Sequence, residues 1–146
     1  MVEHVWTVLC TKSTIDSESN NISLVEVLEQ LSVGDPGGPK EGIVPLPVEL
    51  VTLWSRKNYD QPVAGRGRTS FVRPSGVIPE SIQEHPIDLR VSKRLRHRQK
   101  FAGIPVREAG LHLFRVELFD EATAQWLLVA SIPLEILFEP LTPATR

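Results

Sequence analysis

Apolar and polar residues alternate most regularly near the end of the chain, in two runs separated by a polar turn at residues 120–124. In the run 111–119, the apolar residues on one face are Phe114, Val116 and Leu118. In the run 125–137, the residues on one face are Trp126, Leu128, Ala130, Ile132, Leu134 and Ile136. Two alternating runs joined by a short polar turn are typical of an antiparallel hairpin with one buried face.

Shorter runs with the same period predict further strands, at residues 4–11, 48–56, 66–73 and 87–101. Residues 22–33 are ambiguous, because Val25, Leu28 and Leu31 also have the spacing of a helix face. We choose a strand there, since the polar turn at 15–21 joins it to the first strand as a hairpin.

Glycine and proline mark the connections. Residues 34–47 hold four of each and predict a loop. Residues 78–86 are expected to be irregular, because Pro79 and Pro86 argue against a central strand. For the same reason Pro133 predicts that the last strand is bulged or lies at a sheet edge at that point.

Seven or eight alternating runs with no long helix predict an all-β fold, an antiparallel β-sandwich of the immunoglobulin-like type. The length of 146 residues suits one domain, which we place at residues 1–138. The last residues, 139–146, contain two prolines and are expected to form a C-terminal tail.

One local pattern resembles the immunoglobulin-type corner, in which an acidic residue, a glycine, a tyrosine and a cysteine alternate at the start of the penultimate strand. The matching positions are Glu108, Gly110, His112 and Phe114, so histidine and phenylalanine replace the two signature residues. The resemblance implies a corner hydrogen bond made by His112, and it makes Trp54 the counterpart of the buried core tryptophan. It implies a fold and no receptor function.

The chain is also similar to a family of small uncharacterised bacterial proteins. The opening strand of these proteins often ends in cysteine, followed by an Asp/Asn turn, a Ser-Leu strand and a glycine-initiated strand near the C-terminus. The matching positions are Cys10, Asp16, Asn20, Asn21, Ser23, Leu24 and Gly110. This resemblance implies the same β-fold and carries no mechanism.

The formal net charge of −2 hides an uneven distribution. Residues 1–50 carry a net charge of −6, residues 51–100 carry +7, and residues 101–146 carry −3. The basic middle third either attracts a polyanion or is compensated by neighbouring acidic strands.

The strongest functional candidate is the basic stretch 87–101. As a strand, it places Arg90, Arg94, Arg96, Arg98 and Lys100 on one face. An apolar stripe at helical spacing competes with this interpretation; we favour the strand because the surrounding pattern is β. Such a face can contact phosphates, or it can be solvated and partly paired with Glu117 on a neighbouring strand. Only Phe71 and Phe101 stand near enough in sequence to offer aromatic stacking.

No motif commits the chain to a reaction. Cys10 lies in an apolar strand and is expected to be a core residue. The four histidines (4, 85, 97 and 112) show no metal-ligand spacing, and neither a Gly-x-Ser-x-Gly elbow nor an HExxH motif occurs. We therefore expect no enzyme activity, no metal and no cofactor.

The beginning of the chain lacks the basic segment of a signal peptide, no run is long enough to cross a bilayer, and the single cysteine allows no internal disulfide. These features predict a cytoplasmic protein without membrane contact. The first hypothesis is a non-catalytic β-sandwich module that acts through protein contacts or as a homo-oligomer; the second is a binder of polyanions or nucleic acid. The third and least favoured is a small-ligand enzyme, which requires a pocket with convergent polar groups.

Overall fold

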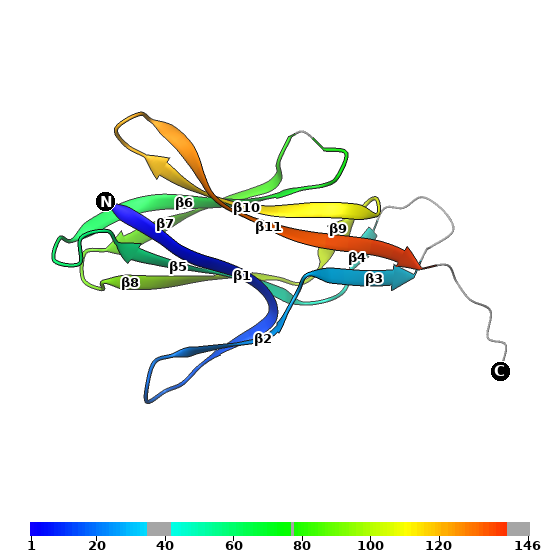
Figure 1. Cartoon of the computed structure of the whole chain (residues 1–146), viewed down its shortest axis with the longest axis horizontal. Coiled ribbons are helices and arrows are strands. Elements are labelled where there is room, and N and C mark those ends of the chain that lie inside the picture. Colours follow the sequence, from blue (N-terminus) through cyan, green and yellow to red (C-terminus); the bar gives the residue numbers. More distant parts are fainter. Residues whose placement is uncertain (35–41, 77, 140–146) are drawn as a thin grey trace.

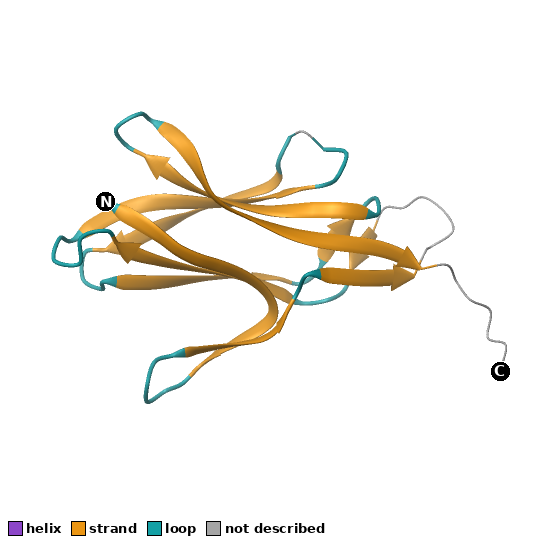
Figure 2. Cartoon of the chain, in the orientation of Figure 1, coloured by secondary structure: helices purple, strands orange, loops and turns teal. Residues whose placement is uncertain are grey.

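All regular structure in the described part of the chain is β-strand (Figures 1 and 2). The computed structural model describes residues 1–34, 42–76 and 78–139. Within these ranges the strands are β1 (Val2–Ile15), β2 (Ile22–Val27), β3 (Gln30–Gly34), β4 (Gly42–Val44), β5 (Val48–Arg56), β6 (Val63–Val72), β7 (Glu80–Leu89), β8 (Arg94–Phe101), β9 (Ile104–Val106), β10 (Gly110–Asp120) and β11 (Gln125–Glu139).

Two main sheets lie one above the other, as Figure 1 shows. The four-stranded sheet, here sheet A, has the order β2-β1-β5-β8, and the five-stranded sheet, sheet B, has the order β3-β11-β10-β6-β7. Strands β4 and β9 pair separately. All pairings are antiparallel except that of β3 with β11. The predicted all-β sandwich is confirmed, with more strands than the seven or eight expected.

The core lies between the sheets, and β5 and β10 both contribute to it. Alternate residues of the strand predicted at 48–56 are buried there: Val48, Leu50, Thr52 and Trp54. From β10 the core receives Phe114, Val116 and Leu118. Because the inner face of each strand is set by this alternation, the residues between them in sequence occupy the outer faces.

The predicted hairpin of β10 and β11 is confirmed, with one correction to its buried face. Val116 pairs with Ala130 but Glu117 pairs with Leu128, so Val129 is an extra residue that forms a β-bulge. The bulge reverses the alternation before it. Trp126 and Leu128 therefore lie on the outer face beside Glu117, and the expectation that they share a face with Leu134 and Ile136 is wrong.

Residues 22–33 form two strands instead of one. Strand β2 belongs to sheet A and β3 to sheet B, and the chain changes sheet at Leu28 and Glu29. Leu28 turns into the core, where its N–H donates to the carbonyl of Leu9 at 2.9 Å. An apolar residue that fills the core where the chain crosses between sheets lies outside the alternation of either strand. The sequence pattern therefore does not reveal it.

Prolines proved compatible with an edge strand. Residues 80–89 form β7, contrary to the irregular segment expected, and β7 is the last strand of sheet B. An edge strand tolerates Pro86 because its outer side needs no N–H donor. Pro133 also lies where predicted, on a stretch of β11 that β3 does not cover, since β3 pairs only with residues 135–139.

Part of the predicted loop 34–47 is strand β4, while residues 35–41 lie outside the described residues. Glu139 ends β11, and the rest of the predicted tail also lies outside them. The corner is as expected from the resemblance: the buried His112 ring has Nδ1 3.0 Å from the carbonyl oxygen of Gly110 and stacks on Phe71.

Candidate anion-binding cleft

The basic stretch is divided between two sheets. Strand β7 ends at Leu89 in sheet B, and β8 begins at Arg94 in sheet A, so residues 90–93 form a crossover. Leu89 is fully buried whereas Val91, two residues later, is 93% exposed, which a continuous strand would not allow. The strand interpretation is confirmed for 94–101, and the expected single strand from residue 87 is wrong.

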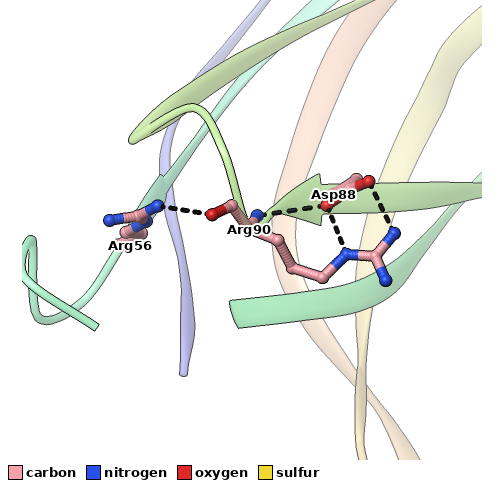
Figure 3. A network of polar contacts seen from close by, with 3 residues as sticks. All are labelled: Arg56, Asp88 and Arg90. Carbon is pink, nitrogen blue, oxygen red and sulfur yellow. Dashed lines mark hydrogen bonds and ion pairs between the residues drawn. The ribbon is translucent and has the colours of Figure 1, made fainter. Parts of the chain in front are cut away.

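Arg90 belongs to the crossover and is separated from the other predicted site residues. Its guanidinium donates two hydrogen bonds to the carboxylate of Asp88, each 2.9 Å long (Figure 3). These bonds lower the pKa of Asp88 to about 2. Arg90 is therefore compensated locally, and its inclusion in a continuous basic face is corrected.

A buried arginine fixes the crossover to the end of β5. The guanidinium of Arg56 donates to the carbonyls of Leu89 at 2.8 Å and Tyr59 at 2.9 Å. It also donates to the carbonyl of Arg90 at 3.2 Å (Figure 3). Its backbone N–H donates to the carbonyl of Lys93 at 3.1 Å. These bonds hold the backbone of the crossover, and with it the position from which β8 starts.

The remaining predicted site residues share the outer face of β8, as expected. Arg94, Arg96, Arg98 and Lys100 lie opposite the four outward-facing residues of β5, which are Ser55, Leu53, Val51 and Glu49.

The hairpin of β1 and β2 covers part of this face. Figure 1 shows it bending away from sheet A, and its contacts place it over β8. Arg98 donates from Nε to the hydroxyl of Ser13 at 2.8 Å and from Nη2 to the Ser13 carbonyl at 3.1 Å. At the hairpin tip, Arg96 Nη2 donates to Oδ1 of Asn20 at 3.0 Å.

The carboxylate beside the basic face of β8 is Glu49, and the expected pairing of this face with Glu117 is wrong. Glu49 accepts a hydrogen bond from Ser13 and lies 3.7 Å from Nε of Arg98. Glu117 is in sheet B, where it binds Arg68. The basic face of β8 thus has two parts: Arg98 is compensated beneath the hairpin and Lys100 lies outside the cleft lining opposite Glu49, while Arg94 and Arg96 line a cleft.

This cleft lies between the hairpin and the outer face of sheet A and encloses about 540 Å³. Its lining combines cations, amides and an apolar floor: Trp6, Asn20, Asn21, Ile22, Leu53, Ser92, Lys93, Arg94 and Arg96. None of the lining residues that the structure describes is acidic. The volume is within the range of about 300–1,000 Å³ that holds small ligands.

A β-bulge at Val5 brings Trp6 to the cleft. His4 pairs with Trp54 and Trp6 pairs with Leu53, so Val5 is an extra residue in β1. His4 therefore faces the interior, where its ring lies 5.6 Å from that of Trp54, and Trp6 faces outward. Bulges often redirect a side chain beside a functional site. Sequence reasoning missed Trp6 as the aromatic neighbour of the basic residues.

The aromatic residues that were considered for stacking belong to the core. Phe71 is buried, and Phe101 packs edge-on against Phe114 with ring centroids 5.7 Å apart. Neither is available to a ligand of the basic face.

The other candidate groups are buried or half-buried, and Cys10 lies on the outer side of sheet A, because it pairs with the outward-facing Glu49. Cys10 is fully buried, and burial, followed by the charge of Glu49, raises the pKa of its thiol. His85 and His97 stack between the sheets with centroids 3.6 Å apart. Burial, with a smaller effect of His97, lowers the pKa of His85 to about 4. Within residues 1–34, 42–76 and 78–139, no three ligating groups gather to hold a metal ion, and no helix could span a membrane.

Comparison with known proteins adds little. No family model matches the chain. No curated protein matches it either. Among solved structures, it is similar to the N-terminal domain of PorA, with 11% sequence identity over 92% of this chain and 98% of that chain. The TM-score of 0.30 indicates only a remote similarity of the two chain paths.

Proposed function

We propose that the domain is a binding module whose cleft takes an anionic group of its ligand between Lys93, Arg94 and Arg96. One observation carries the proposal: among the described residues, the side chain of Arg94 has no hydrogen-bond or ion-pair partner, and that of Arg96 has only the neutral amide of Asn20. Cations that are left uncompensated in a concave site attract anions strongly.

The hairpin limits the shape of the ligand. It is tied across β8 at Ser13 and Arg98, so an extended polyanion cannot follow the whole strand from Arg94 to Lys100. We therefore propose that the ligand is a compact anion or the end of a longer polyanion, and not an extended polyanion that lies along the strand.

The proposed function is binding without catalysis. None of the described residues that line the cleft is a carboxylate, a histidine or a cysteine, the groups that most often act as acid, base or nucleophile. The proposal includes a cytoplasmic location, for which the single cysteine is the support.

Charge reversal tests the proposal. A fluorescein-labelled single-stranded hexanucleotide is titrated with the protein at low and at physiological salt, and its anisotropy is recorded. Binding is expected to weaken with salt. The variant Arg94→Glu/Arg96→Glu is expected to bind at least about tenfold more weakly, since charge-assisted hydrogen bonds contribute about 1.5–3 kcal/mol each.

The matched control is Arg66→Glu/Arg107→Glu, which changes the net charge equally on exposed residues outside the cleft lining. It is expected to retain affinity within about twofold, as a distant exposed charge is screened. Equal losses in both variants would show that only net charge matters, and the cleft would then have no special role.

A second candidate function, protein contacts through strand pairing, is favoured by the edge of β11. Within the described residues, β3 covers this edge only at 135–139, and residues 125–134 carry no charge. Leu127 and Leu128 on this stretch are 42% and 52% exposed. Natural edge strands usually carry charges that prevent pairing with another chain.

Light scattering after size exclusion tests whether a second copy pairs there. A dimer that Leu128→Lys converts to a monomer supports this candidate, since an added charge blocks edge pairing. A monomer at every concentration excludes it.

A further inference from the structure

A row of three side chains crosses the outer face of sheet A beneath the hairpin. Trp6 on β1 pairs with Leu53 on β5, and Leu53 pairs with Arg96 on β8. All three line the cleft. Neighbouring strands are about 4.8 Å apart, so the backbones at the two ends of the row are separated by about 10 Å.

The two ends of this row recognise different chemistry. Trp6 offers the largest aromatic surface among side chains, on which a planar ring stacks with about 1–3 kcal/mol per ring. The guanidinium of Arg96, with Arg94 next to it on the same face, suits a phosphate, which arginine binds with paired N–H groups. The cleft therefore changes from apolar and aromatic to cationic over roughly the length of one nucleotide.

The hairpin tip adds amides on the opposite side of the cleft. The side chains of Asn20 and Asn21 line it there, and an amide can both donate and accept hydrogen bonds. Such groups pair with the polar edge of a base, whereas they offer little to a purely aliphatic ligand.

We propose that the anionic group bound in the cleft is the phosphate of a nucleotide unit, whose base lies against Trp6 and Leu53 and whose phosphate lies between Arg94 and Arg96. This inference rests on the proposed function and deepens it. The unit has two sources, a free mononucleotide or the end of a single strand, and both present the same base and phosphate.

Calorimetry on the full chain at low salt tests the inference with four probes: AMP, adenosine, ribose 5-phosphate and inorganic phosphate. AMP is expected to bind at least about tenfold more tightly than any of the other three, because only AMP uses both ends of the row. A fifth probe, an adenylate tetranucleotide, identifies the source: tighter binding than AMP assigns the unit to a strand, and equal binding assigns it to a free nucleotide.

Two tryptophan variants locate the base. Trp6→Ala is expected to reduce the affinity for AMP to that of ribose 5-phosphate, while Trp126→Ala, on the outer face of sheet B, leaves it unchanged. Thermal unfolding followed by circular dichroism confirms that both variants are folded.

The results separate the two levels of the proposal. If ribose 5-phosphate binds as tightly as AMP and Trp6→Ala has no effect, the nucleotide inference is overturned, while anion binding stands. If no phosphate compound binds at low salt, the proposed function fails as well.

Discussion

The outer faces of the two sheets carry the same kinds of residues, but these side chains differ in how far they are paired with one another. On each face a β-bulge directs a tryptophan outward, Trp6 in sheet A and Trp126 in sheet B, and arginines lie on the strand next but one, β8 in sheet A and β6 in sheet B. In sheet B, Arg68 makes two hydrogen bonds to Glu117, at 3.1 and 3.2 Å, and its guanidinium lies 4.3 Å from the ring centroid of Trp126.

In sheet B, the charge of Arg68 and the ring of Trp126 are therefore already engaged within the protein. Arg66 also lies over an aromatic ring, that of Phe119, at 4.2 Å. In sheet A, by contrast, Trp6 and Arg96 are held apart by Leu53, and the hairpin covers the space between them without filling it. Arginine and tryptophan on one face therefore do not by themselves define a binding surface; what matters is which of their charges and ring faces are not already engaged within the protein.

The largest expected effect comes from breaking the support of the cleft. Arg56→Met removes the donors to three carbonyls and is expected to lower the free energy of unfolding by about 3 kcal/mol, because each buried carbonyl left unpaired costs about 1–3 kcal/mol. Urea denaturation measures this change. AMP affinity should also fall, since the crossover bearing Lys93 is no longer fixed.

The corresponding change in sheet B is Arg66→Met. Arg66 is exposed and its contact with Phe119 is worth about 0.5–1 kcal/mol, so the loss of stability should stay below about 1 kcal/mol. Equal destabilisation by the two substitutions would contradict the role assigned to Arg56.

A second prediction concerns the layer between the two faces, where His85 stacks on His97. Because burial lowers the pKa of His85 to about 4, against about 6.5 in an unfolded chain, the folded state binds fewer protons. Stability is therefore complete above about pH 6.5 and is lost as the pH falls towards 4, by about 2–3 kcal/mol.

Chemical denaturation at several pH values between 4 and 7 measures this dependence. Carboxylates titrate in the same range, so the variant His85→Leu serves as the reference. The wild-type slope should exceed that of the variant in this range; identical slopes would show that His85 does not contribute.

Much of the fold was predictable because the strands of the core alternate without interruption. The run 48–56 and the run 111–119 each bury one face from end to end, so their period identifies both the strand and its inner side. The β-bulges explain why some residues were assigned to the wrong face of a strand. A single extra residue, such as Val129, reverses the faces of every residue before it, and nothing in the local sequence marks it.

The candidate site was predictable only in part. The shared face of Arg94 and Arg96 follows from period 2 alone. The presence of Trp6 beside them depends on the strand order β1-β5-β8, which joins residues about 90 positions apart. The crossover at Arg90 was missed because Val91 continues the alternation in sequence while the chain leaves the sheet.

The smallest effect expected is also the most direct test of the comparison. Glu117→Gln removes the charge that compensates Arg68 but keeps the side chain's size. The free energy of unfolding should fall by about 1 kcal/mol, because a partly buried ion pair becomes a weaker neutral hydrogen bond.

Without the negative charge at position 117, the guanidinium of Arg68 beside Trp126 is uncompensated and can bind an anion. In the background Arg94→Glu/Arg96→Glu, in which binding in the cleft is expected to be at least about tenfold weaker, this substitution should add salt-sensitive binding of AMP, measured by calorimetry. The exposed Glu135 provides the control, since Glu135→Gln makes the same charge change on sheet B away from Arg66 and Arg68. If both substitutions produce the same binding, net charge explains it; if neither does, free arginine beside tryptophan is not sufficient, and the cleft must owe its binding to the hairpin above it.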